Sequence, residues 1–149
     1  MLFRSLHNQL TQDVQLLPVG QSRFSGYCNA QGRLQASMVV HKKATDEVWL
    51  IIRRELLART MKRLSMFVLR AKVQLSDHTP PQAVWGLSGE VMQALGLATL
   101  PPWSTSELAH GTVISLYPVG TQARALLLPH SDMPLNATFS PSEIGRAHV

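Results

Sequence analysis

The sequence predicts an α+β fold in which antiparallel sheets pack against helices. Short segments that alternate apolar and polar residues are joined by turns containing glycine or proline, a pattern typical of hairpins. Helix-like segments interrupt these hairpins, which favours α+β over a parallel doubly wound sheet. Hydrophobic residues make up 45% of the 149-residue chain, which is enough to form a core.

The first expected element is a helix over residues 6–14. Leu6, Leu10 and Val14 recur there at a spacing of four, which places them on one helix face. Residues 18–20 contain proline and glycine and are predicted to turn the chain into the first strand.

Three strands are expected next, over residues 22–29, 33–41 and 47–53. The segment 30–32 ends in glycine and is predicted to be the turn of a hairpin. The third segment is rich in Val, Trp and Ile, which are common in strands. These segments predict a small antiparallel sheet.

A helix is predicted over residues 55–66, followed by a strand over 67–75. Leu57, Met61 and Leu64 form one apolar stripe of the helix. Arg59, Lys62 and Arg63 are expected on the opposite face. The strand is predicted from the alternation of apolar and polar residues that follows the helix.

The second half of the chain is expected to begin after a boundary at residues 78–82, where two prolines break regular structure. Ser88 is predicted to cap a helix that ends before another proline pair. The elements expected in this half are a strand at 83–87, a helix at 89–97, and strands at 112–117 and 123–128 around a turn at 118–120.

The positive charge is concentrated in one part of the chain. The formal net charge is +5, but residues 42–72 contain nine Lys or Arg and three acids, a local net charge of +6. This asymmetry predicts an anionic partner, either a polyanionic ligand tail or nucleic acid. The basic surface is expected to include Arg59, Lys62, Arg63 and Arg70. A solvated helix face and a lysine-protected strand edge would explain the same charges.

The residue pattern argues against several kinds of site. A metal site is not expected, because Cys28 is the only cysteine and no two histidines share a helix face at i, i+4 spacing. Residues 86–90 partly match the G-x-S-x-G nucleophile motif but lack its last glycine. No apolar run approaches the roughly 18 residues of a transmembrane helix, so we expect no membrane contact. A single cysteine also favours a cytoplasmic protein.

The two ends of the chain are predicted not to be native. Residues 1–5 can be encoded by GTGCTCTTCCGATCT, with GTG as start codon. The reverse complement, AGATCGGAAGAGCAC, encodes residues 143–148 in one frame. This DNA matches a sequencing-library adapter. We therefore expect residues 1–5 and 143–149 to be adapter-derived and 6–142 to be a fragment of a longer protein.

Three segments in order resemble the N-terminal part of the folate-binding YgfZ family, which is related to the aminomethyltransferase (T-protein) of the glycine cleavage system. They are Gln-Leu-Thr-Gln-Asp-Val at 9–14, Gly-Tyr-Cys-Asn-Ala-Gln-Gly-Arg-Leu at 26–34 and Lys-Arg-Leu-Ser-Met-Phe-Val-Leu-Arg-Ala-Lys-Val at 62–73. The resemblance implies that residues 6–78 are the first part of a T-protein-like folate-binding domain. It also implies that 83–142 begin a second α+β subdomain, which is incomplete.

The resemblance implies tetrahydrofolate binding and a role in maintaining iron–sulfur enzymes, including some that modify tRNA. It assigns folate contacts to Phe24, Asn29 and Ser37. T-proteins carry two aspartates where this chain has Ala36 and Ser37, and a tyrosine where it has Phe24. A hydroxyl cannot stabilise a cationic intermediate as a carboxylate does, so we expect binding without aminomethyl transfer and no catalytic residue in this chain.

Two alternatives remain open at this stage. One is a folate-dependent aminomethyltransferase of the glycine cleavage type with an altered site. The other is a basic RNA-binding module, whose affinity would fall steeply with salt and ignore folate. The YgfZ signature Lys-Gly-Cys-Tyr-x-Gly-Gln-Glu does not occur in the chain and would be expected beyond residue 142.

Overall fold

The computed structural model describes residues 9–68, 73–78, 84–109 and 111–130. The chain divides into two compact units between Asp77 and His78, at the start of the proline-containing segment. We call them the first and the second unit, and each is described by itself. Among the described residues, no helix is both long and apolar enough to cross a membrane.

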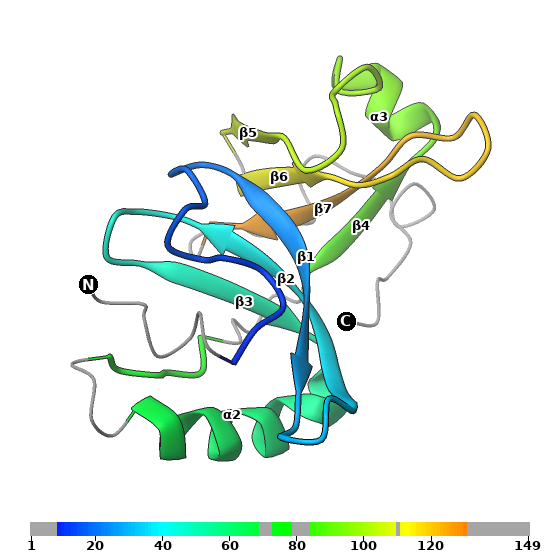
Figure 1. Ribbon diagram of the computed structural model, residues 1–149. Helices are drawn as coiled ribbons and strands as arrows, with labels where there is room; N and C mark the ends of the chain where they lie inside the picture. The colour runs from blue at the N-terminus through cyan, green and yellow to red at the C-terminus, as the bar shows by residue number, and fades with distance from the viewer. Residues whose placement is uncertain (1–8, 69–72, 79–83, 110, 131–149) are drawn as a thin grey trace. The chain divides into compact units, whose positions relative to one another are not determined.

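The first unit contains an antiparallel sheet of three strands in the order β1-β2-β3 (Figure 1). β1 is Ser22–Cys28, β2 is Leu34–Lys42 and β3 is Val48–Ile52. These bounds confirm the three strands predicted for this half within one or two residues at each end.

A tight turn between β1 and β2 sets the register of the hairpin. Gly32 has a φ of 75°, a conformation that glycine adopts without steric cost. The Gly32 N–H donates to the Asn29 carbonyl at 2.9 Å. Ser22 is then opposite His41 and Tyr27 is opposite Ala36, with a bulge after Tyr27.

The core of the first unit lies on one face of this sheet. Strand side chains alternate between faces, so Tyr27, Ala36, Met38 and Val40 share the core face. Helix α2, Arg54–Val68, buries Leu64 in the same cluster. The buried members of the cluster are Leu10, Val14, Leu17, Tyr27, Ala36, Met38, Val40 and Leu64.

Helix α2 confirms the predicted helix, but its buried stripe is shifted from the expected one. Leu64 is 2% exposed and Thr60 is 5% exposed, while Leu57 and Met61 are only half-buried. Leu56 also packs against the core cluster. The helix therefore turns the Leu56, Thr60 and Leu64 side towards the sheet.

The helix predicted over residues 6–14 is wrong over its described part. Leu10 instead forms an isolated antiparallel bridge with Tyr27. The Thr11 N–H donates to the Gly26 carbonyl at 2.9 Å, and the Gly26 N–H donates to Thr11 Oγ1 at 2.8 Å. The apolar spacing of four reflects burial of a bridged and turning segment, rather than one face of a helix.

The strand predicted over residues 67–75 is also wrong where it is described. Phe67 belongs to α2, and residues 73–75 have no strand assignment. Val73 and Leu75 still pack against the core cluster, with exposed Gln74 between them. The alternation of apolar and polar residues therefore reflects contact of Val73 and Leu75 with the core, in a segment that is not paired as a strand.

The second unit contains a four-stranded antiparallel sheet in the order β4-β7-β6-β5 (Figure 1). Its strands include β4 at Trp85–Ser88, β6 at Gly111–Ser115 and β7 at Arg124–Pro129, which confirm three predicted strands. The sequence did not predict β5, Thr105–Leu108. Both units combine antiparallel sheets with helices, so the α+β prediction is confirmed.

The helix of the second unit is shorter than predicted and differently capped. Helix α3 spans Glu90–Ala94, and Gly89 stands at its N-cap without a side-chain hydrogen bond. Ser88 is the last residue of β4 and pairs with Arg124 across the sheet. The predicted Ser88 cap is therefore wrong, because strand pairing continues through that residue.

The core of the second unit is formed by Leu87, Val91, Met92, Leu97, Val113, Ala125 and Leu127.

Candidate functional site

Two of the predicted folate-contacting residues, Phe24 and Ser37, lie on the same face of the β1–β2 hairpin. Phe24 is opposite Val39 and Ser37 is opposite Gly26, so the two are diagonal neighbours. The Phe24 ring is 54% exposed, and Ser37 is half-buried. An exposed ring beside a hydroxyl can contact the flat face and a polar edge of a heteroaromatic molecule.

The third predicted residue, Asn29, lies in the turn that follows β1. Its Oδ1 accepts hydrogen bonds from the Gln31 N–H at 3.0 Å and from the Arg33 N–H at 2.9 Å. These bonds hold the turn in the way typical of asparagine. The structure thus gives the Asn29 oxygen a role in the hairpin, and a ligand contact by this residue stays a prediction.

The predicted basic surface lies along α2. Arg59, Lys62 and Arg63 are all exposed, as expected. Arg59 Nη2 donates to the Gln35 carbonyl of β2 at 3.1 Å, which places this cation beside the strand that carries Ser37. The fourth predicted cation, Arg70, lies outside the described residues.

A buried polar pair, which the sequence did not predict, lies on the same sheet face as Phe24. His41 Nδ1 is 3.0 Å from Ser22 Oγ, and the two residues are 1% and 0% exposed. Trp49 is opposite His41 in β3, and their rings meet edge to face with centroids 5.9 Å apart. The predicted hairpin indicates this pair indirectly. In an antiparallel hairpin the first residue of one strand faces the end of the other, and here Ser22 faces His41.

Two more side chains lie next to the His41–Trp49 contact: Lys43, which follows β2, and Glu47, which precedes β3. Lys43 Nζ is 5.1 Å from the centre of the Trp49 ring, within cation–π range. Trp49 Nε1 donates to Glu47 Oε1 at 2.6 Å. These two contacts orient the ring, and a ligand on this face would meet an oriented indole.

A cavity of about 210 Å³ lies on the opposite, core side of the same sheet. Binding pockets for small molecules usually have volumes of about 300–1,000 Å³, so it is small for a folate. It contains none of the predicted site residues. The lining residues are Gln12, Asp13, Val14, Leu16, Leu17, Pro18, Arg23 and Val40.

Buried Lys42 holds the loop that forms one wall of this cavity. The residue is 8% exposed, and its Nζ donates to the carbonyls of Gln15 at 3.0 Å and Val14 at 3.4 Å. The backbone of Lys42 also bonds to Gly20 and Gln21. Lys42, one of the nine cations of residues 42–72, therefore holds this loop in place through hydrogen bonds, and we call this contact the Lys42 clamp.

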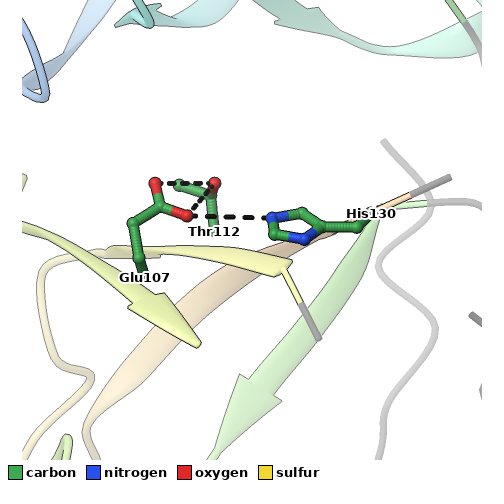
Figure 2. A network of polar contacts seen from close by, with 3 residues as sticks. All are labelled: Glu107, Thr112 and His130. Atoms are coloured by element: carbon green, nitrogen blue, oxygen red, sulfur yellow. Dashed lines mark hydrogen bonds and ion pairs between the residues drawn. The ribbon is translucent and has the colours of Figure 1, made fainter. Parts of the chain in front are cut away.

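The second unit has a small polar network on its sheet, drawn in Figure 2. Thr112 Oγ1 lies 2.9 Å from both carboxylate oxygens of Glu107, to which it donates. His130 Nε2 lies 3.8 Å from Glu107 Oε2, and both side chains are at least half exposed. The network joins β5, β6 and the residue that follows β7, and the exposed Glu107–His130 contact contributes little to stability.

The described residues contain no group of three His, Cys, Asp or Glu side chains that could hold a metal ion. Cys28 is a free, half-buried thiol at the bulge of β1.

No family model matches the sequence, and no curated protein matches it either.

Proposed function

We propose that the protein binds tetrahydrofolate and does not transfer an aminomethyl group. The observation that carries this proposal is the placement of Phe24 and Ser37 on one face of the hairpin. The Phe24 ring is 54% exposed there. A pterin or aminobenzoate ring can stack on such a side chain, and the Ser37 hydroxyl can bond to a polar edge.

The chemistry of Ser37 supports binding over transfer. A neutral hydroxyl at this position supplies no negative charge to stabilise a cationic folate intermediate. The neighbouring Ala36 is 3% exposed and faces the core cluster, so it offers no replacement. The resemblance to T-proteins supports a folate-binding fold, while these two positions support the loss of transfer chemistry.

The wider role follows from the YgfZ resemblance of residues 9–14, 26–34 and 62–73. We propose that the protein supports iron–sulfur enzymes, including enzymes that modify tRNA. The exposed cations of α2 supply positive charge that can attract the anionic glutamate tail of a folate, and one of them, Arg59, donates to the Gln35 carbonyl of β2.

Equilibrium dialysis of the protein against tetrahydrofolate tests binding, and a methylene-tetrahydrofolate assay tests transfer. We expect saturable binding and no product. Measurable product from the protein with Ser37 unchanged would overturn the accessory role in favour of the aminomethyltransferase. Binding of tRNA that falls steeply with salt, together with no folate binding, would favour the RNA-binding module.

A further inference from the structure

The outward face of α2 combines positive charge with exposed apolar side chains. At about 100° per residue, Met66 projects about 20° from Arg59, 40° from Lys62 and 60° from Arg63 around the helix axis. These cations stand seven, four and three residues before Met66, so they lie on the same face. Met66 is therefore the apolar centre of a basic cluster, which we call the Met66 face (Arg59, Lys62, Arg63, Met66 and Phe67).

The exposure of these side chains is large. Met66 is 58% exposed and Phe67 is 47% exposed, and the three cations are exposed as well. No acidic residue occurs between Arg59 and Phe67, and Glu55, one turn before Arg59, is the one acid of α2, so the face keeps a net positive charge. Arg59 is anchored by its bond to the Gln35 carbonyl, which limits the entropy lost when it binds a partner.

The composition of the face favours a protein partner. Arg, Met and Phe are enriched in protein–protein interfaces, and methionine adapts to irregular apolar surfaces. A polyanion bound through its phosphates alone would leave Met66 exposed. Proteins that bind single-stranded nucleic acids stack successive bases on several aromatic side chains. The Met66 face has one aromatic ring, Phe67.

We propose that the Met66 face docks an acidic protein segment that places an apolar side chain on Met66, with carboxylates on the three cations around it. Charge complementarity specifies the sign of the partner, and the central methionine requires an apolar residue between its acids. The Met66 face shares its three cations with the surface proposed for the folate glutamate tail, but Met66 and Phe67 have no part in that proposal. Peptide binding that is weakened in Met66→Gln therefore tests the docking inference separately from folate binding.

The test uses a synthetic amphipathic helical peptide with leucine along one stripe and glutamate on both sides. Fluorescence anisotropy measures its binding to the protein. The controls are the same peptide with glutamine in place of glutamate, poly(U) RNA, and vesicles containing an anionic phospholipid. The variants are Met66→Gln and the triple change of Arg59, Lys62 and Arg63 to glutamine. Val119→Gln is a matched control, because Val119 is also 58% exposed.

We expect the acidic peptide to bind, and the triple variant to abolish that binding. Met66→Gln should weaken it about tenfold, as for a central interface residue. Val119→Gln should bind as the unchanged protein does. Equal binding of the glutamine peptide, or equal affinity of Met66→Gln and Val119→Gln, would overturn the proposal. Binding of RNA or vesicles but not of the acidic peptide would also overturn it. Circular dichroism of each variant separates loss of binding from loss of folding.

Discussion

Phe24 and Ser37 are diagonal neighbours on one face of the β1–β2 ladder, because Phe24 is opposite Val39 and Ser37 is opposite Gly26. Diagonal pairs in an antiparallel sheet lie about 7–8 Å apart, within reach of a single small ligand. The core lies on the other face of the sheet, so replacing either side chain leaves the buried cluster intact. These positions can therefore be tested for binding without a large loss of stability.

Two substitutions of Asn29 distinguish its role in the turn from a role in binding folate. Asn29→Ala removes the acceptor for the Gln31 and Arg33 N–H groups and should lower the free energy of unfolding by about 1 kcal/mol. Asn29→Asp keeps an oxygen acceptor and should preserve stability, while it removes the side-chain amide donor. If Asn29 contacts folate through that donor, Asn29→Asp should weaken binding in dialysis. Unchanged folate affinity of Asn29→Asp would mean that this residue serves the turn and does not contact folate through its amide.

Lys42 is predicted to stabilise the first unit through the loop that it holds. Lys42→Met keeps the apolar stem and removes the ammonium that bonds to the carbonyls of Val14 and Gln15. Urea unfolding should show a loss of about 1–3 kcal/mol, because these acceptors lose their partner in a largely buried place. Lys43→Met is the control and should change stability by less than about 1 kcal/mol. Equal effects of the two changes would refute the clamp role.

Gly111 is predicted to be intolerant of any side chain. A Cβ at this position would lie 2.3 Å from the Leu128 carbonyl oxygen, and a backbone atom in a paired strand cannot move aside. Gly111→Ala should lower the free energy of unfolding by about 3 kcal/mol. Gly32→Ala is the comparison: its Cβ would meet no atom within 4 Å, and only the positive φ costs about 1–2 kcal/mol. Thermal unfolding that ranks the two variants in the reverse order would contradict this account.

Ser22 is predicted to matter because its hydroxyl is the partner of a buried imidazole. Ser22→Ala removes the group 3.0 Å from His41 Nδ1 and should cost about 1–3 kcal/mol in chemical denaturation. Ser65→Ala is a control, since the Ser65 hydroxyl is exposed and donates to the Lys62 carbonyl of its own helix. A cost at Ser22 no larger than that at Ser65 would mean that the buried pair contributes nothing to stability.

The hairpin and α2 could be predicted because local signals agree there. The Gly32 turn, the alternation of β1 and β2, and the separate polar and apolar sides of α2 are all visible in neighbouring residues. The first segment misled the prediction, because the Asp13 side chain accepts the N–H groups of Gln15 and Leu16 and forms a turn. An apolar spacing of four does not distinguish that turn from a helix.

Other elements depend on contacts that are distant in sequence. β5 has the composition Thr-Ser-Glu-Leu and little apolar alternation, and it exists through its pairing with β6. The Ser22–His41 pair depends on strand register, and the Lys42 clamp depends on a loop 27 residues earlier. Phe24 and Ser37 were selected by family resemblance, and the register of the hairpin then places them on one face.

The central claim is that the exposed Phe24 ring and Ser37, on one face of the first sheet, bind a folate. The most direct measurement compares tetrahydrofolate binding by Phe24→Ala and Phe67→Ala in equilibrium dialysis. Their rings are similarly exposed, at 54% and 47%, but they belong to different elements. We predict that Phe24→Ala weakens binding about tenfold and that Phe67→Ala leaves it unchanged. Equal affinity of the two variants, or no saturable binding by the unchanged protein, would contradict the account.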